Sequence, residues 1–487
     1  MCSNRKSGNI DNTDAEIIAI LLKLHEEDQK TNKQLLATID ELKIIIEELR
    51  AQLNLNSSTS NFPPSRDLYP PVNKNRSLRK KSDRKVGGQP NHKGTTRELD
   101  DNPDEITRLS PDSCSCGCSM DGVPVLKTIR RQLIDIPKVR YHIHEYQVEV
   151  KVCPHCGKVV QHEFPSEVPN TISFGNNLKS EILYDRNYTL LPAQKIVEKY
   201  ETKYNLKISP ATILNTVNKA NTCLLPYNDS VKNALLKSNV IHCDETGFRV
   251  EGERRWLHSV STSRLTFYQP HAKRGAEAMV ENGVLPQYTG TVMTDYWNAY
   301  SKFSCKHTYC KAHIIRELRG VSEASPNQHW AKNLERLFEE MYDYITVQGG
   351  MSPKKISEFE QRYESLVAEG LIQNPPGTRK SVRGKPKNSK AYNLLRRLKD
   401  TQQDVLAFLY NPEIPYTNNL AERDIRMMKV QQKISGTFRS VQGAESFCNI
   451  RAYISTVVKN NGNISEALEK LAGGKIMPLE DILKGGE

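Results

Sequence analysis

The sequence predicts a multi-domain protein of mixed α+β and all-α class, with helical segments before and inside an α/β core. Three observations support this. Residues 14–53 carry apolar side chains at alternating spacings of three and four, as a coiled-coil helix does. Residues 238–244 and 290–295 are apolar, rich in β-branched side chains and end on a carboxylate, which is typical of buried strands with the acid at an exposed end. Residues 315–410 are mostly helical in pattern.

The expected N-terminal helix has one continuous apolar seam, and charged residues fill much of the rest. The seam favours a coiled coil that makes the chain a homodimer or a higher oligomer. The alternative is a single amphipathic helix packed on its own domain. Dimerisation is preferred because the following segment, residues 54–98, provides no core for packing. The seam consists of Leu35, Ile39, Leu42, Ile46, Leu49 and Leu53.

Residues 54–98 have the composition of a basic, disordered linker. Between Lys74 and Arg97 there are nine Lys or Arg residues and one acid, Asp83. Such a segment cannot bury enough apolar surface to order itself. It is a solvated tether, a contact for DNA phosphates, or both.

Cysteines concentrate in residues 99–172, which we expect to form a small zinc-finger-like module. Cys153 and Cys156 have the spacing of a zinc half-site. The other group has no two-residue gap, and it consists of Cys114, Cys116 and Cys118. We expect a Cys₄ zinc site with Cys114 and Cys116 as the first pair and Cys118 as the rival; the alternative is a turn without metal. Structural zinc would contribute folding energy directly.

Residues 173–232 are expected to form a cluster of helices. Residues 192–200 and 209–217 are separated by a polar turn, which is the pattern of a helix-turn-helix, with Ser209 as N-cap and Pro210 as the first helical residue. The second helix would then lie in a major groove of DNA. Short helical pairs are also ordinary packing units, so both interpretations stay open.

The core is expected at residues 233–460, with a helical insertion at about 315–410 and a helical tail at 461–487. Within the core, strands are expected at 238–244, 255–260, 265–269 and 290–295, with a helix at 275–282 before the fourth strand. The resulting order, β-β-β-α-β, is that of a ribonuclease H-like core.

Three acids are the candidate catalytic residues. Asp244 and Asp295 end the first and fourth expected strands, and Glu422 follows an Asn pair that favours a helix start, so it should stand in the first turn. Two Mg²⁺ ions about 3.5–4 Å apart, held by oxygen ligands, suit an in-line displacement at phosphorus. The alternative is that these acids are ordinary solvated side chains.

Short motifs follow one another along nearly the whole chain. They are the polar stretch 56–58 with 63–65, the segment 87–94, the cysteine module, the Asp-Glu-Thr block at Asp244, the Thr-Asp-Tyr block at Asp295, residues 310–313 and residues 418–423. In this order they closely resemble the DDE transposases of the insertion-sequence-66 type. The resemblance implies that Asp244, Asp295 and Glu422 carry the Mg²⁺ ions, for which Mn²⁺ is a substitute, and that the reaction is DNA strand cleavage and strand transfer.

Basic residues near these acids are candidates for DNA contact. They are Lys273, Arg274, Arg423, Arg426, Lys429, Lys433 and Arg439. Arg426 lies four residues after Glu422, on the same side of the expected helix, where it suits either the carboxylate or a phosphate. Cys310 and His313 resemble a Cys-x-x-His signature of several transposase families. We expect them to be structural, as a packed thiol and a hydrogen-bonded imidazole.

Composition agrees with a nucleic-acid partner. The chain has 69 Lys and Arg against 57 Asp and Glu, a formal net charge of +12, which favours phosphate backbones. No apolar stretch approaches the roughly 20 residues of a membrane helix, so we expect a cytoplasmic, nucleoid-associated bacterial protein. Its expected partners are double-stranded DNA, as terminal repeats and target, and accessory proteins of the same element. The alternatives are a dimeric zinc-containing DNA-binding regulator with an inactive core and a structure-specific nuclease.

Overall fold

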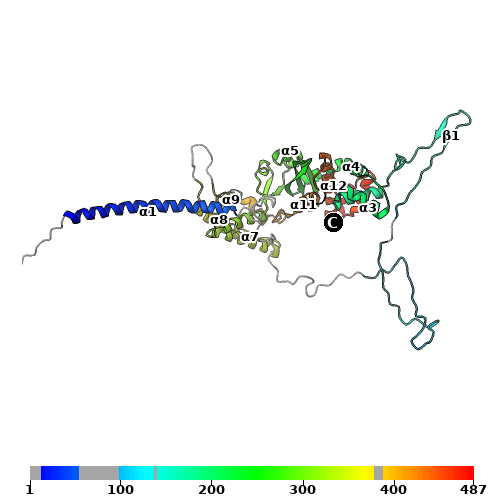
Figure 1. Cartoon of the computed structure of the whole chain (residues 1–487), viewed down its shortest axis with the longest axis horizontal. Helices are drawn as coiled ribbons and strands as arrows, with labels where there is room; N and C mark the ends of the chain where they lie inside the picture. The colour runs from blue at the N-terminus through cyan, green and yellow to red at the C-terminus, as the bar shows by residue number, and fades with distance from the viewer. Residues whose placement is uncertain (1–11, 54–97, 137–139, 378–387, 487) are drawn as a thin grey trace, which may run out of the picture. The chain divides into compact units, whose positions relative to one another are not determined.

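The computed structural model describes four stretches of the chain, and the basic linker expected at residues 54–98 lies almost wholly outside them. The described stretches are residues 12–53, 98–136, 140–377 and 388–486 (Figure 1). The chain divides into two compact units. The larger contains Met1–Arg76, Phe164–Glu198 and Lys207–Glu487, and the smaller contains Ser77–Glu163 and Lys199–Leu206.

The N-terminal segment forms one long helix, α1 (Asn12–Leu53), as its spacing predicted (Figure 1). The seam stays open to solvent in the single chain. Its described side chains are 45–54% exposed, and these belong to Leu35, Ile39, Leu42, Ile46 and Leu49. Whether a second copy covers this seam stays a prediction.

A five-stranded mixed sheet forms the centre of the larger unit. Its strand order is β5-β4-β3-β6-β7. The neighbours β3, β4 and β5 pair antiparallel, whereas β3–β6 and β6–β7 pair parallel. The strands are β3 (Val240–Val250), β4 (Glu253–Ser261), β5 (Thr266–His271), β6 (Thr291–Thr294) and β7 (Lys306–Tyr309). Helix α5 (Ala276–Asn282) stands between β5 and β6 along the chain, so the predicted order β-β-β-α-β is found.

The first strand differs from the prediction in one respect. We expected it to end at Asp244, but β3 continues to Val250. The reason is the hairpin with β4, whose antiparallel pairing runs from His242 to Val250 and keeps the chain extended. The parallel pairing with β6 stops at His242. Asp244 therefore lies within a strand, just beyond the point where its parallel neighbour ends.

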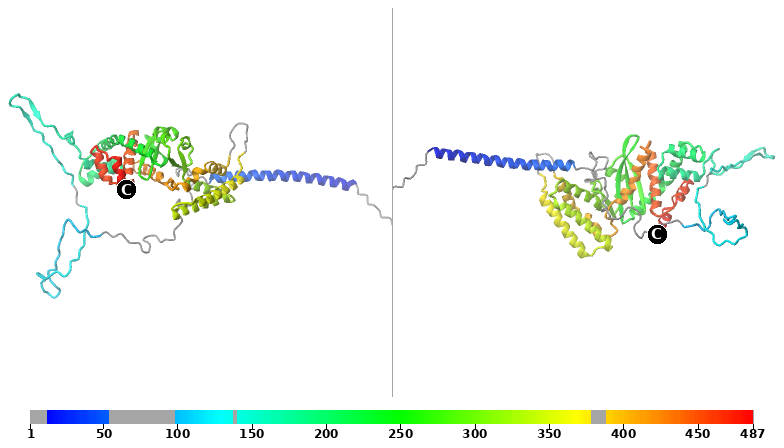
Figure 2. Two further views of the ribbon diagram at one scale, coloured as in Figure 1. Left: turned by 180° about the vertical axis from the view of Figure 1, so that it is seen from behind. Right: turned by 60° about the horizontal axis from the view of Figure 1, so that its bottom comes forward.

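Helices cover both faces of the sheet, because side chains along each strand alternate between two apolar cores. On one face, Ile241 and Phe267 pack with α4 (Pro210–Leu236), α12 (Val441–Lys459) and α13 (Ile464–Ala472). On the other face, apolar residues of β3, β4 and β5 pack with α11 (Asn419–Ser435) and α12; they are Phe248, Leu257 and Tyr268. Figure 2 shows α12 in orange beside the green strands.

The predicted helical insertion is present between β7 and α11. Its helices are α6 (Lys311–Ala324), α7 (His329–Gln348), α8 (Pro353–Gln373), α9 (Lys390–Asp400) and α10 (Gln402–Tyr410). They share a core of large side chains that includes Trp330, Phe338, Phe359 and Tyr363, all fully buried. The yellow helices of this insertion group together in Figure 2.

The helices before the sheet are α2 (Asn176–Leu183), the π-helix η2 (Tyr184–Tyr188), α3 (Ala193–Tyr204) and α4. Ser209 is the N-cap of α4, as expected: its hydroxyl accepts a hydrogen bond from Thr212 N at 3.1 Å. Helix α4 continues to Leu236, far past residue 217, because its buried face serves the core of the sheet. Recognition of DNA bases by this helix stays a prediction.

The C-terminal segment is helical, as expected, with α13 followed by α14 (Leu479–Lys484). No helix in the described part of the chain is both long and apolar enough to cross a bilayer.

Candidate active site

The sheet register brings the two candidate aspartates together. In the parallel pair β3–β6, His242 lies opposite Met293. The same offset, carried two residues further, places Asp244 opposite Asp295, which directly follows β6. Both side chains are partly buried. Residues opposite each other in a sheet project from the same face. The two carboxylates therefore lie on the same face of the sheet, although they are 51 positions apart in the sequence.

Asn418 fixes the start of the helix that carries the third acid. Glu422 stands in the first turn of α11, and Asn418 is the residue just before that helix. The Asn418 side chain makes no capping bond and instead reaches β3. Its Nδ2 donates to Cys243 O at 2.9 Å, and its Oδ1 lies 2.8 Å from His242 Nδ1. Both partners immediately precede Asp244, so this amide ties the start of α11 to the strand that carries the first acid.

Further contacts fix α11 on the sheet. The Tyr268 hydroxyl donates to Asp424 O at 2.7 Å, and Lys459 Nζ lies 2.7 Å from Asp424 Oδ2. The Lys429 ammonium donates to Gly247 O. Helix α11 is therefore attached to β3, to β5 and to α12, which limits the freedom of Glu422 in its first turn.

The charges of the neighbouring acids act on both aspartates. Burial raises the pKa of Asp244 well above its usual value, and the charges of Glu245, Asp295 and Glu422 raise this pKa further. Burial, followed by the charge of Glu245, raises the pKa of Asp295 to about 6, although the Trp297 N–H donates to its Oδ1 at 2.9 Å. Clustered carboxylates of this kind repel one another unless a cation lies among them.

Glu245 is a fourth buried acid, and the sequence reasoning assigned it no role. Its side chain is 1% exposed. Arg274 Nη2 lies 2.6 Å and Arg274 Nε 2.9 Å from its Oε1, and the Tyr300 hydroxyl donates to its Oε2 at 2.7 Å. The Arg274 guanidinium also lies against two indole rings, 4.9 Å from the Trp256 centroid and 4.2 Å from that of Trp297. The position of Glu245 directly after Asp244 was the one feature of the sequence that could have indicated its role.

We expect Arg274→Ala to destabilise the larger unit because it leaves Glu245 buried without its cation. Removing one partner of a buried ion pair costs about 3–5 kcal/mol. The Arg274 side chain is 40% exposed, so solvent screening reduces the expected loss of unfolding free energy to about 1–2 kcal/mol. Urea unfolding measures it. Lys273→Ala is the control, because Lys273 pairs with Glu277 where both side chains are more than half exposed. Equal stability of the two variants would contradict the assigned role.

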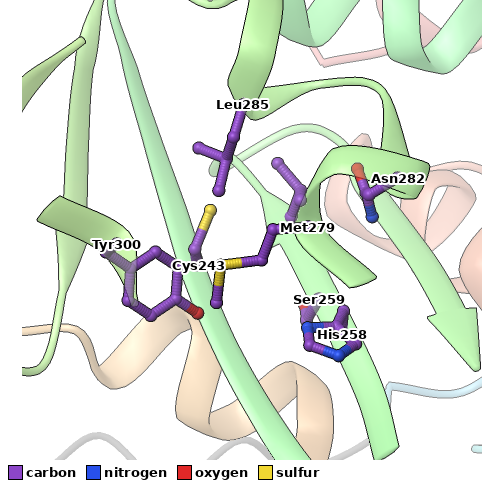
Figure 3. A pocket seen from close by; sticks show the side chains of 8 residues that line it. Cys243, His258, Ser259, Met279, Asn282, Leu285 and Tyr300 are labelled. Carbon is purple, nitrogen blue, oxygen red and sulfur yellow. The ribbon is translucent and has the colours of Figure 1, made fainter. Parts of the chain in front are cut away.

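A small pocket lies behind β3, on the face opposite the aspartates (Figure 3). Figure 3 shows the side chains of Cys243, Met279 and Tyr300 around it. It has room for about one water molecule. Asn282 lines it, and neither polar atom of the Asn282 side chain has a partner among the described residues. This pocket is too small for a substrate and belongs to the core.

The remaining predicted DNA contacts are exposed. Three of them are exposed on α11, and the fourth follows that helix. They are Arg423, Arg426, Lys433 and, after the helix, Arg439. Lys429 is exposed too, although its ammonium group already binds Gly247 O. Together with the exposed part of Arg274, these residues make a basic surface next to the acids. Contact of this surface with DNA stays a prediction.

Cys310 and His313 lie at the start of α6, close to Glu422. Cys310 is buried as expected, and its Sγ accepts a hydrogen bond from Asn418 N at 3.2 Å. The expected hydrogen bond of His313 is not found at Nδ1, which has no partner among the described residues. This atom instead lies 3.9 Å from Glu422 Oε1.

The smaller unit contains the five clustered cysteines. Cys153 and Cys156 lie in the turn between β1 (Val150–Val152) and β2 (Val159–Gln161), which Gly157 permits with φ +71°. The Cys156 and His155 amides lower the pKa of the Cys153 thiol, which favours a thiolate ligand. Cys114 N donates to Cys118 O at 2.9 Å and closes a second turn. The single set of three potential metal ligands found among the described residues includes none of these cysteines, so the zinc site stays a prediction.

Comparison with known proteins agrees with this geometry. A family described as "Transposase IS66 family" matches residues 171–446, which contain all three candidate acids. Residues 12–98 match a family of unknown function, DUF6444. No curated protein matches the chain. Because the first match covers more than half of the 487 residues, the chain belongs to the IS66 family of transposases.

Proposed function

We propose that this transposase cleaves and joins DNA strands at the ends of an insertion sequence, with Asp244, Asp295 and Glu422 as the catalytic triad of a ribonuclease H-like core. The observation that carries the proposal is that the charges of Asp295 and Glu422 both raise the pKa of Asp244. The β3–β6 register supports the pairing of the aspartates, and the Asn418 contacts support the position of Glu422. The sheet supports a ribonuclease H-like core, because its first three strands pair antiparallel and the next two add in parallel.

The residues present fit Mg²⁺. The two aspartates and Glu422 offer only oxygen donors, which hard cations prefer. The pKa values of the aspartates are raised, which suits a bound cation. When bound, two Mg²⁺ ions would activate the attacking oxygen and stabilise the leaving one. Mn²⁺ has the same ligand preference and is expected to replace Mg²⁺.

The protein's own part in the reaction is to position the strands. Asp244 and Asp295 are presented by the sheet, and α11 presents Glu422 together with its exposed arginines. The arginines would grip phosphates beside the scissile bond. In the first step, water attacks the phosphodiester at the transposon end and a 3′-hydroxyl leaves. In the second, that 3′-oxygen bonds to a target phosphorus, and the target strand's own 3′-oxygen leaves.

Two other functions use the same parts. A dimeric DNA-binding regulator with an inert core would bind DNA and cut nothing, and a structure-specific nuclease would cut without joining. The raised pKa values of the clustered aspartates favour an enzyme over a regulator, because an inert core has no need of repelling acids at one edge. Family membership favours joining over hydrolysis alone.

We expect EDTA to abolish strand joining while the binding of end-bearing DNA persists. The reason is that the acids need a cation for chemistry, whereas phosphate contacts depend on Lys and Arg. Purified protein is incubated with DNA that carries the element's ends, with Mg²⁺, with Mn²⁺ or with EDTA, and products are separated on a denaturing gel. Added Mg²⁺ in excess of EDTA is the control and restores joining. Joining in EDTA would contradict the proposal, and cutting without joining in Mg²⁺ would favour the nuclease.

The assembly is proposed to be a homodimer or higher oligomer through α1. The exposed apolar seam supports this, since a soluble helix rarely leaves so regular a stripe in water. Double-stranded DNA, both as terminal repeats and as target, is the proposed substrate, and accessory proteins encoded by the same element are proposed partners. Zn²⁺ is proposed to stabilise the cysteine module.

A further inference from the structure

A thiol, an imidazole and a carboxylate converge where α6 begins. Cys310 precedes the helix, His313 lies three residues later on the same side, and Glu422 approaches from α11. One ligand atom of each residue, Sγ, a ring nitrogen and a carboxylate oxygen, lies within 4.8 Å of the other two. These residues come from two helices more than 100 positions apart in the sequence, so the fold and not the local sequence assembles the group.

Two of these groups have no hydrogen-bond partner. His313 Nδ1 and Glu422 Oε1 are both buried and unpaired among the described residues. They lie 3.9 Å apart, which is too far for a hydrogen bond. An unsatisfied buried polar atom costs about 1–3 kcal/mol, and a cation bound between these two atoms would satisfy both.

The third group is a buried thiol whose sulfur is already a hydrogen-bond acceptor. Cys310 Sγ accepts the Asn418 amide hydrogen at 3.2 Å, and the Ala312 and His313 amides at the start of α6 also favour its charged form. Burial raises the pKa of the Cys310 thiol against these contacts. A metal ion removes that conflict, because a coordinating thiol is deprotonated outright.

We propose that Cys310, His313 and one oxygen of Glu422 bind a thiophilic divalent cation of the Zn²⁺ class, separate from the Mg²⁺ ions. Sulfur and nitrogen ligands select Zn²⁺ and disfavour Mg²⁺. Three protein ligands and one open position are an ordinary zinc set, whose bond lengths require N···O separations of about 3.3 Å. The observed separation of His313 Nδ1 and Glu422 Oε1 is 3.9 Å, so binding would draw these two side chains together.

Such a cation would fix the side chain of Glu422 to the start of α6. With Oε1 committed to the Cys310–His313 cation, the other oxygen of Glu422 would remain as a ligand for the catalytic ions; this consequence rests on the proposed function. The binding of the cation itself does not rest on it. Metal content therefore tests this inference even if the protein joins no DNA.

The experiment measures metal in the full-length protein. Zinc is quantified by mass spectrometry of the purified wild type and of Cys310→Ser, with the fold checked by circular dichroism. Cys310→Ser is expected to lose about one equivalent of zinc, as one site with fewer thiolate ligands predicts. Cys448→Ser is the matched control: Cys448 is also fully buried, but it lies in the apolar core beside α11 and should retain the zinc.

The five-cysteine module is a second possible source of zinc, so Cys153→Ser is measured alongside. The losses in Cys153→Ser and Cys310→Ser should add in the double variant if two sites exist. Cobalt-loaded protein gives a second reading, because the cobalt–thiolate absorption contributed by Cys310 is lost in Cys310→Ser. If that variant does not fold, His313→Ala provides the same comparison. A folded Cys310→Ser or His313→Ala with wild-type zinc content and cobalt spectrum would overturn the proposal.

Discussion

Asp244→Asn, Asp295→Asn and Glu422→Gln are each expected to reduce strand joining by at least about 10²–10³-fold, the size of effect seen when one preorganised electrostatic contact of a transition state is removed. Each substitution keeps the shape of the side chain and removes one charged oxygen ligand. Binding of end-bearing DNA should remain within about twofold, because phosphate contacts depend on Lys and Arg. A denaturing gel measures joining and a mobility-shift gel measures binding.

These variants also distinguish catalysis from structure. The charges of the neighbouring acids raise the pKa of Asp244, so replacing either aspartate relieves repulsion, and the melting temperatures of Asp244→Asn and Asp295→Asn should not fall. Glu253→Gln is the matched control, since Glu253 is an exposed acid at the start of β4 in the same sheet, and its joining should equal that of the wild type. Normal joining by any of the three triad variants would refute the assignment.

Local sequence patterns were sufficient to predict most elements of the core. The succession of strands along the chain, the helix before β6, the helical insertion and the place of Glu422 in a first helical turn all follow from periodicity and from cap residues, which act over a few positions. The same holds for Ser209 at the start of α4. These features were predictable because each is decided by residues next to one another in the sequence.

What could not be predicted depends on residues far apart. The extension of β3 past Asp244 follows from its hairpin with β4. The role of Glu245 depends on Arg274 and Tyr300, which come from other segments. Asn418 was recognised as a helix start, yet its side chain binds a strand 175 residues earlier in the chain. None of these pairings leaves a periodic signal, because side-chain hydrogen bonds between distant elements have no fixed spacing.

Asn418 carries the second large expected effect. It is 2% exposed, and its amide joins α11 to β3 through Cys243 O and His242 Nδ1. Burial lowers the pKa of His242, so the ring is neutral at pH 7 and donates Nδ1–H to the amide oxygen. Asn418→Ala leaves both partners buried and unpaired, at about 1–3 kcal/mol each. We expect a loss of about 2–6 kcal/mol of unfolding free energy, from the same two unpaired groups.

Strand joining should fall with this change even at temperatures where the variant stays folded, because the amide positions Glu422 relative to Asp244. A misplacement of about 1 Å in a catalytic group costs roughly 10²-fold in rate. Urea unfolding and the joining assay are measured on the same preparations. Asn419→Ala is the control: Asn419 is adjacent but exposed, so it should leave both quantities unchanged.

Asn418→Ser separates the link to β3 from helix capping. Ser is as good an N-cap as Asn, and the native Asn418 side chain makes no capping bond. Ser is too short to reach both Cys243 O and His242 Nδ1 from the start of α11. If the link matters, Asn418→Ser joins DNA as poorly as Asn418→Ala, although its helix start is intact. If Asn418→Ser matches the wild type in stability and joining, the position matters only as a helix start and Glu422 is held by other contacts, those of Asp424 with Tyr268 and Lys459 first among them.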